Sequence, residues 1–140
     1  LLLSLLSLVI LKFRKGRCNM EFRENQAIYL QIADHIIEHI VLKKWEEGKR
    51  IPSVREMAVQ LEVNPNTVAR TFSYLQEKEV IFNKRGIGYF VAEDGYKKAR
   101  EVKREEFIKH DVPVFFRKME LLEMNLEELY QIYNNQEKNN

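Results

Sequence analysis

Apolar residues recur at helical spacing in the segment AIYLQIADHIIEHIVLKK, residues 27–44. The apolar positions on one side of this segment are Ile28, Tyr29, Ile32, Ala33, Ile36, Ile37 and Ile40. A repeat of three to four residues predicts an amphipathic helix whose apolar side packs on a core. Gly48 and Pro52, which follow in EEGKRIP, are expected to end it.

Two shorter helices are predicted after Pro52. The first, within SVREMAVQLE (53–62), opens with a capping box, because Ser53 and Glu56 can each bond the other's backbone N–H. The second opens with NPNTVARTF (64–72), where Asn64 is the N-cap and Pro65 takes the first helical position without losing a hydrogen bond. The residues expected to face the core are Val54, Met57, Ala58 and Leu61 on the first helix and Val68, Phe72 and Leu75 on the second.

The segment VIFNKRGIGYFV predicts a two-stranded hairpin. Its strands are expected at Val80–Phe82 and Tyr89–Val91, and a basic tip that contains glycine joins them. Two short helices joined by a tight turn and followed by a hairpin form a helix-turn-helix with a wing. The predicted fold is therefore mostly α with a small β-hairpin.

The chain returns to a helical pattern after Asp94, with a second capping box at Asn125 and Glu128. This segment of about 45 residues holds many large apolar groups, but too few to close a core of its own. The surplus predicts contact with a second copy of the chain. We assign dimerisation to Phe107, Val114, Phe115, Met119, Leu122, Leu126, Leu129, Tyr130 and Tyr133.

A length of 140 residues suits one domain with a short appendage. We divide the chain into an N-terminal segment (1–19), a winged helix-turn-helix domain (20–94) and a helical tail for dimerisation or effector binding (95–140). Four of the 23 basic residues lie before Met20, which leaves 19 basic against 21 acidic residues. Bulk charge therefore does not favour indiscriminate nucleic-acid binding, and the case for DNA rests on local placement.

The N-terminal segment LLLSLLSLVILKFRKGRCN begins with an apolar run, Leu1 to Leu11. The run is shorter than the about 20 residues of a membrane-spanning helix, and basic residues follow it, whereas they precede the apolar part of a signal peptide. We interpret residues 1–19 as upstream sequence translated from a misplaced start, with Met20 as the natural first residue; a membrane anchor is the alternative. The single cysteine, Cys18, lies here, so the remainder suits a reducing, cytoplasmic setting.

The helix that begins at Pro65 presents Asn66, Thr67 and Arg70 on the side opposite its core residues. This is the part of a recognition helix that enters a DNA major groove. Arg70 can pair with a guanine edge or a phosphate, and the other two can hydrogen-bond to bases or backbone. The alternative is that all three are solvated polar positions.

Basic residues also stand at the first helix of the pair and at the wing. Arg55 lies in a first helical turn, where free N–H groups favour a phosphate; the alternative is a surface ion pair with Glu56 or Glu62. Lys84 and Arg85 accompany two glycines, Gly86 and Gly88, which let the backbone approach a minor groove.

Metal binding and catalysis find little support. His35 and His39 are four residues apart, a spacing that can ligate a metal with help from His110 and Asp111, but no HExxH pattern is present. We interpret the two histidines as a solvated helix flank. Because the sequence has no phosphate-binding glycine loop and no nucleophile motif, we predict that the protein is not an enzyme and uses no cofactor or metal.

Four separated blocks resemble the DNA-binding domain of GntR-type bacterial transcription regulators. They are IYLQIADHIIEHI, GKRIPSVREMA, VNPNTVARTFSYLQEKEVI and KRGIGYFV, in consistent order from about Ile28 to Val91. The short tail, with FIKHDVPVFFRKMELLEMNLEELYQIY, resembles the YtrA-type branch. The resemblance implies a homodimer, joined largely by the tail, on a pseudo-palindromic operator in double-stranded DNA. We expect no membrane partner.

The resemblance also implies roles for single residues. Ser53 and Arg55 would contact phosphate, and Arg85 with Gly86 would form the wing tip. Asn64, Asn66, Thr67 and Arg70 belong to the helix at the groove. Pro65 and Ala69 stand where many relatives have arginines, and Glu62 replaces a glycine common in the turn. Members of this branch commonly repress their own operon, often one for an ABC transporter.

Two other functions stay open at this point. A winged-helix module that binds protein would fit the acidic balance after Met20. A small metal or ligand sensor would use His35, His39 or the aromatic residues of the tail. The sequence names no small-molecule effector.

Overall fold

The computed structural model describes residues 26–137. The predictions for residues 1–19, including Met20 as the natural start and the place of Cys18, lie outside the described residues. Two compact units make up the chain: the first ends at Arg100 and the second begins at Glu101. Within residues 26–137, no helix is long and apolar enough to cross a membrane.

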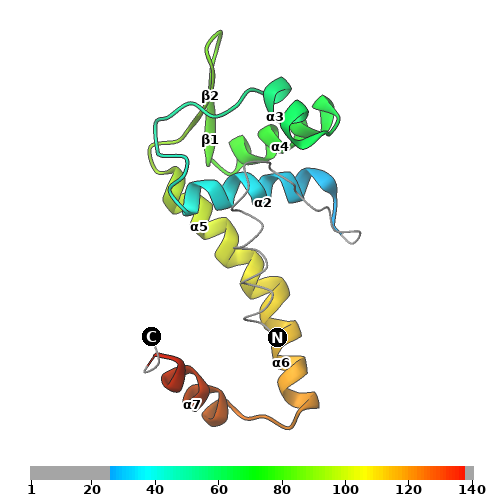
Figure 1. Cartoon of the computed structure of the whole chain (residues 1–140), viewed down its shortest axis with the longest axis vertical. Coiled ribbons are helices and arrows are strands. Elements are labelled where there is room, and N and C mark those ends of the chain that lie inside the picture. Colours follow the sequence, from blue (N-terminus) through cyan, green and yellow to red (C-terminus); the bar gives the residue numbers. More distant parts are fainter. Residues whose placement is uncertain (1–25, 138–140) are drawn as a thin grey trace. The chain divides into compact units, whose positions relative to one another are not determined.

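Among the described residues, three helices and a hairpin form the body of the first unit (Figure 1). The helices are α2 (Ile28–Val41), α3 (Val54–Leu61) and α4 (Pro65–Glu77), and the strands are β1 (Ile81–Lys84) and β2 (Gly88–Val91). Helix α5 (Gly95–Glu106) begins directly afterwards. The three predicted helices and the hairpin are therefore confirmed.

The core of the first unit forms where α2 and α3 both pack against α4. Its fully buried large side chains come from every element of the unit: Ile32, Ile36, Ile37 and Ile40, then Ile51 and Met57, Val68, Phe72 and Leu75, and finally Val80, Ile81 and Val91. The prediction was wrong at Ile28, which is 47% exposed. As the first residue of α2 it precedes the buried stripe, which begins at Gln31 and Ile32. Val54 is only half-buried.

A buried hydroxyl ties α4 to α2. Thr71 is fully buried, and its Oγ1 lies 2.8 Å from the carbonyl oxygen of Tyr29 and 3.1 Å from that of Thr67. Because an unpaired buried hydroxyl would cost on the order of 1–3 kcal/mol, this pairing favours one register between the two helices.

The predicted caps form as expected. The carboxylate of Glu56 accepts from the N–H of Ser53 at 2.7 Å, and Ser53 Oγ accepts from the N–H of Glu56 at 3.2 Å. Asn64 Oδ1 accepts from the N–H of Asn66 at 2.8 Å, with Pro65 as the first helical residue. The starts of α3 and α4 are thus fixed by contacts within a few residues.

The hairpin is longer than predicted and has an additional neighbour. Strands β1 and β2 pair antiparallel from Ile81 with Val91 to Lys84 with Gly88. The segment 48–51 adds to the open edge of β2: the N–H of Gly48 donates to Val91 O at 2.9 Å, and the N–H of Ile51 donates to Tyr89 O at 3.0 Å. The sequence of this segment predicts only a helix breaker, and its pairing with β2 was not predicted.

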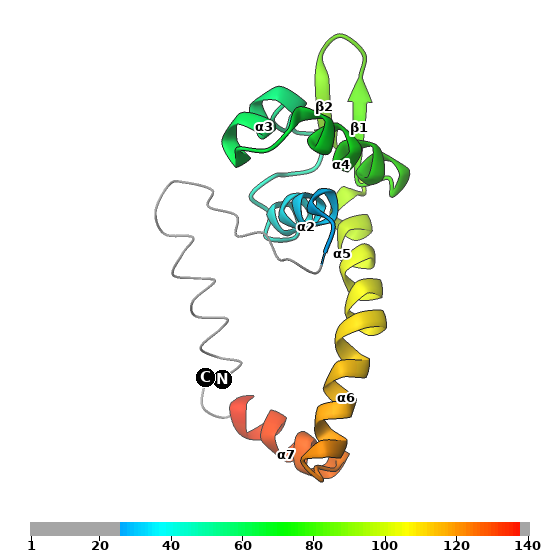
Figure 2. The ribbon, with the colours of Figure 1, turned by 90° about the vertical axis from the view of Figure 1, so that its right-hand side faces the viewer.

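The second unit is helical in its described part (Figure 2). After α5 come a π-helical turn, η1 (Phe107–Asp111), and then α6 (Val112–Leu121) and α7 (Leu126–Glu137). Pro113 lacks the N–H that a regular helix would bond four residues back, which accounts for the wider turn before it. The predicted capping box at Asn125 and Glu128 is confirmed at 3.1 and 2.9 Å.

Large apolar side chains of the second unit are mostly exposed. Of the residues assigned to dimerisation, Met119 is buried within its own chain and Leu129 is half-buried, while the other seven are exposed. The structure adds Ile108, Phe116, Leu121 and Ile132 to the exposed set.

Candidate nucleic-acid interface

A three-residue turn sets the angle between α3 and α4. Glu62 adopts the left-handed conformation with φ of 54°, and the N–H of Val63 donates to the carbonyl of Ala58 at 3.0 Å. This hydrogen bond pairs a carbonyl that would otherwise be free in the last turn of α3, and the chain then leads directly to the N-cap at Asn64. The turn has no glycine, so the left-handed position is held by a residue that adopts it at a cost.

The first two turns of α4 carry the residues proposed for the major groove. Asn66 and Arg70 are exposed, and Thr67 is half-buried, while Val68 and Phe72 anchor the opposite side of the helix in the core. Arg70 is not free in solvent: its Cζ lies 3.9 Å from the centroid of the Tyr29 ring on α2. The guanidinium is therefore held against the aromatic ring of α2.

The N-terminus of α3 leaves one basic side chain without a partner. Arg55 is exposed and forms no ion pair with any residue in the described range, so the alternative pairing with Glu56 or Glu62 is not seen. The hydrogen bonds from Ser53, followed by the charge of Arg50, lower the pKa of the Glu56 carboxyl. Ser53 itself serves as the cap of α3.

The wing carries basic and aromatic groups together. Phe82 and Phe90 stack with centroids 5.7 Å apart, and Lys84 Nζ lies 4.9 Å from the centroid of Phe90. The tip beyond them exposes Arg85, Gly86 and Ile87. Gly86 has φ of +78°, which a side chain would disfavour, so glycine is required by the turn itself. In both ribbon views the hairpin tip extends past α3 and α4 (Figures 1 and 2).

Sequence reasoning missed Arg50. It lies in the segment beside β2, forms a bridge with Phe90, and is exposed. A Cβ placed on Gly88 would come within 3.1 Å of Arg50 Nε, so this glycine makes room for the arginine as well as for the turn. The charge of Arg50 also contributes, as the smallest cause, to the lowered pKa of the Glu56 carboxyl. The basic pair in GKRIP was the available signal.

The two histidines of α2 form an aromatic stack. The His35 and His39 rings lie 4.4 Å apart, and His39 lies 4.8 Å from Trp45. Burial, and then the charges of His39 and Lys44, lower the pKa of His35 to about 4. Both rings are half-buried, so the predicted solvated flank was wrong. In the described part of the chain, no three side chains of the kinds that ligate metals gather into a site.

Comparisons with known proteins agree with this geometry. Residues 28–91 match the model of bacterial regulatory proteins of the gntR family. The chain is 41% identical over 110 residues to YhcF of Bacillus subtilis, an uncharacterized HTH-type transcriptional regulator. The match covers 74% of this chain and 90% of that protein. It is 33% identical over 72 residues to the transcriptional repressor YtrA of the same organism, covering 51% of this chain and 55% of the repressor.

A solved structure shows the same fold. The crystal structure of a GntR-family transcriptional regulator from Bacteroides thetaiotaomicron is 46% identical, with a TM-score of 0.69, and the match covers 81% of this chain and 98% of that one. The helix pair, the wing and these relationships together show that the chain belongs to the gntR family and is a DNA-binding transcriptional regulator with a winged helix-turn-helix.

Proposed function

We propose that this regulator is a cytoplasmic homodimer that represses transcription by occupying a pseudo-palindromic operator in its own operon. The resemblance to the YtrA-type branch leads us to propose that this operon encodes an ABC transporter. The main observation in favour of a dimer is the density of exposed large apolar side chains on η1, α6 and α7. These side chains include Phe115, Leu121 and Tyr130. A stable soluble chain seldom leaves so much apolar surface uncovered. The similarity to a protein named as a repressor supports the sign of regulation.

The DNA contacts divide into three groups in this proposal. Arg55, with the free N–H groups at the start of α3, holds a phosphate, and Ser53 fixes that helix start. Asn66, Thr67 and Arg70 read the major groove from a helix whose start Asn64 sets. Lys84, Arg85, Gly86 and Gly88 approach the minor groove, with Arg50 beside them. Two recognition helices related by a two-fold axis would reach half-sites about 34 Å apart.

Binding to DNA upstream of the protein's own gene tests the function. We expect a specific complex by fluorescence anisotropy, with affinity that falls by roughly 10³ or more between 50 and 200 mM salt if six or more phosphates are contacted. Absence of binding at low salt would favour the alternative of a module that binds protein. A reporter gene behind the same DNA gives the sign, because a repressor lowers its expression.

The oligomeric state needs a matched pair of variants. Phe115→Glu together with Tyr130→Glu places charges on the exposed apolar surface of the second unit, and we expect a monomer by light scattering. Leu42→Glu changes an apolar residue that is as exposed as Tyr130 but lies at the C-cap of α2, and it should leave the dimer intact. A monomeric wild-type protein would contradict the proposal.

A further inference from the structure

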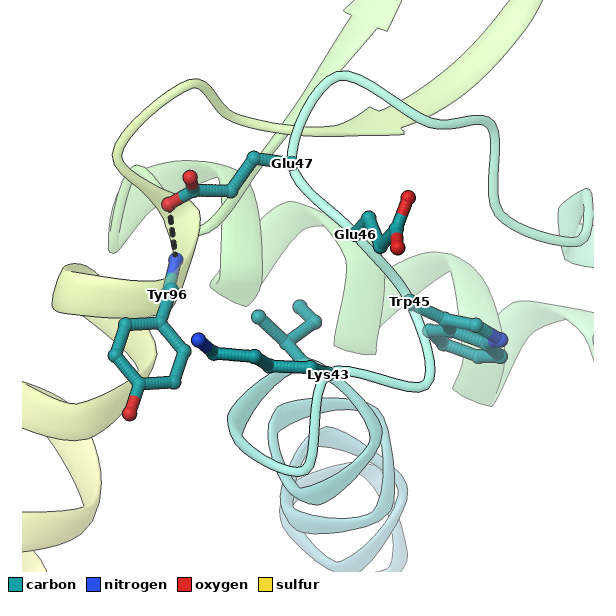
Figure 3. Close-up of a pocket in the computed structure, with 6 residues that line it drawn as sticks. Lys43, Trp45, Glu46, Glu47 and Tyr96 are labelled. Atoms are coloured by element: carbon teal, nitrogen blue, oxygen red, sulfur yellow. Dashed lines mark hydrogen bonds between the residues drawn. The ribbon is translucent and has the colours of Figure 1, made fainter.

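A small cavity lies within the first unit, away from the wing tip. It has a volume of about 230 Å³ and is lined by Ile40, Lys43, Trp45, Glu46, Glu47 and Tyr96 (Figure 3). These residues come from the last turn of α2, the loop that follows, and the first turn of α5. The buried Ile40 side chain forms part of the lining, and the remaining lining residues are aromatic or charged.

Two basic side chains already lie over the Tyr96 ring of this cavity. Lys43 Nζ lies 5.2 Å from the ring centroid, and Arg100 Cζ lies 5.7 Å from it. Figure 3 shows the Lys43 side chain reaching toward the ring, with Trp45 on the other side of Lys43. The face of an aromatic ring attracts ammonium groups. Lys43 is thus an internal occupant, and its flexible stem can withdraw when another cation takes its place.

Only one of the two carboxylates that line the cavity accepts a hydrogen bond from the described residues. Glu47 accepts a hydrogen bond from the N–H of Tyr96 at 3.0 Å and so fixes the start of α5 against the loop. The Glu46 side chain has no hydrogen-bond or ion-pair partner among residues 26–137. When Lys43 withdraws, the two carboxylates face only the Arg100 guanidinium at the Tyr96 ring, which leaves the cavity with one net negative charge. The cavity therefore suits a cation, and its volume, below the roughly 300 Å³ of sites for drug-sized ligands, limits that cation to a compact one.

We propose that this cavity binds a small organic ammonium ion, whose charged group replaces the Lys43 ammonium on the Tyr96 ring and lies near Glu46. The methyl groups of a quaternary ammonium would pack against Ile40 and the aromatic rings. An inorganic cation of the same charge would gain less from this lining, because it holds its hydration shell more tightly than a quaternary ammonium does.

The position of the cavity gives such a ligand a route to the DNA-binding surface. The loop that carries Glu46 and Glu47 continues into Gly48 and Lys49, which hydrogen-bond to Val91 on β2. Arg50, beside the wing, follows at once. Binding that shifts the loop would therefore shift the edge of the wing, and this consequence rests on the proposed DNA-binding function.

Trp45 is the only tryptophan in the sequence, so its fluorescence reports on this cavity directly. We would titrate the full chain with choline at constant ionic strength, using sodium chloride for the balance, and confirm saturation by calorimetry. The uncharged analogue 3,3-dimethylbutan-1-ol has the same shape without the charge. We expect choline to saturate with a Kd below about 10 mM, and the analogue to bind at least tenfold more weakly. Equal binding of the two, or no saturation by choline, would overturn the proposal.

Variants separate this site from a general effect on fluorescence. Tyr96→Leu should abolish choline binding, and Tyr96→Phe, which keeps the ring, should retain it. Glu46→Gln should weaken binding. Lys43→Gln removes the internal competitor and should tighten binding about threefold or more; weaker binding in this variant would contradict the replacement of Lys43. Circular dichroism of each variant checks that it is folded.

The effect on DNA is measured separately. At matched ionic strength, choline should change the operator affinity of the wild type and leave that of Tyr96→Leu unchanged. An unchanged wild-type affinity would overturn the link to the wing, while failure of DNA binding itself would be a failure of the proposed function and would leave the choline titration intact.

Discussion

The guanidinium of Arg70 lies over the ring of Tyr29, with its Cζ 3.9 Å from the ring centroid. The same Tyr29 accepts the hydroxyl of Thr71 through its carbonyl, and its ring meets Tyr74 edge-on with centroids 6.2 Å apart. Tyr29 therefore joins α2 to α4 and also supports the side chain proposed to read DNA. An arginine supported in this way loses less conformational freedom when it binds.

The role of Tyr29 can be tested by two substitutions. Tyr29→Leu removes the ring beneath Arg70, and we expect operator affinity to fall about two- to fivefold, which corresponds to the ~0.5–1 kcal/mol of an exposed cation–π contact. Tyr29→Phe keeps the ring and should bind as the wild type does. If Tyr29→Leu bound the operator normally while Arg70→Ala did not, Tyr29 would have no positioning role.

Arg70 and Arg55 should differ in what they contribute. Arg70→Ala is expected to cost about 1–3 kcal/mol of operator binding and to relax the preference at one base pair, since it removes a base contact. Arg55→Ala should weaken binding to all DNA sequences alike. It should also reduce the slope of log affinity against log salt concentration by about 1. Affinities for a set of operator variants at several salt concentrations measure both effects. An unchanged sequence preference in Arg70→Ala would refute its base-reading role.

The left-handed residue in the turn predicts a gain in stability. Glu62 has φ of 54°, a conformation that glycine adopts without strain. Glu62→Gly should raise the free energy of unfolding by roughly 0.5–1 kcal/mol, because the relief of strain exceeds the entropy that glycine adds to the unfolded chain. Gln60→Gly, at an exposed position inside α3, should lower it by about 1 kcal/mol. Denaturant titration compares the two, and a loss of stability in both would contradict the role of the turn.

His35 predicts a pH dependence of stability. Its pKa is about 4 in the folded protein, compared with 6.5 for an unperturbed histidine. Between these values the unfolded chain binds a proton that the folded protein does not, so the stability present above about pH 6.5 falls as the pH drops toward 4. We expect a loss of roughly 1 kcal/mol between pH 7.5 and 5, after allowance for solvent screening of this partly exposed group.

Urea unfolding at the two pH values measures this effect. His35→Gln should reduce the difference between them, whereas His110→Gln, on the exposed π-helical turn, should leave it unchanged. An identical pH dependence in His35→Gln and the wild type would show that other groups cause it.

Helix starts were predictable because their determinants are local. Ser53 with Glu56, Asn64 with Asn66, and Asn125 with Glu128 bond across no more than three residues. A short polar side chain placed before an apolar repeat finds the free N–H groups of the next turn wherever that helix later packs. The winged helix-turn-helix followed from the order of these starts and the hairpin.

Helix ends were less predictable because the usual glycine signal is missing. Four non-glycine residues with φ between 54° and 58° follow the ends of helices: Lys43, Glu62, Glu79 and Glu123. In each case the next N–H donates to a carbonyl five residues back, as from Val80 to Leu75 and from Met124 to Met119. These hydrogen bonds and the core contacts beside them outweigh the local preference of the residue.

The sequence by itself determined the helices, their caps, the hairpin and which side of α4 faces away from the core, since each depends on residues within one or two turns. The tertiary structure decided the pairing of segment 48–51 with β2, the stacking of His35 on His39 and Trp45, and the support of Arg70 by Tyr29. The pairing of segment 48–51 with β2 and the contact of Arg70 with Tyr29 join residues far apart in the chain, and the core formed by Ile36, Phe72 and Val91 is what brings them within reach of one another.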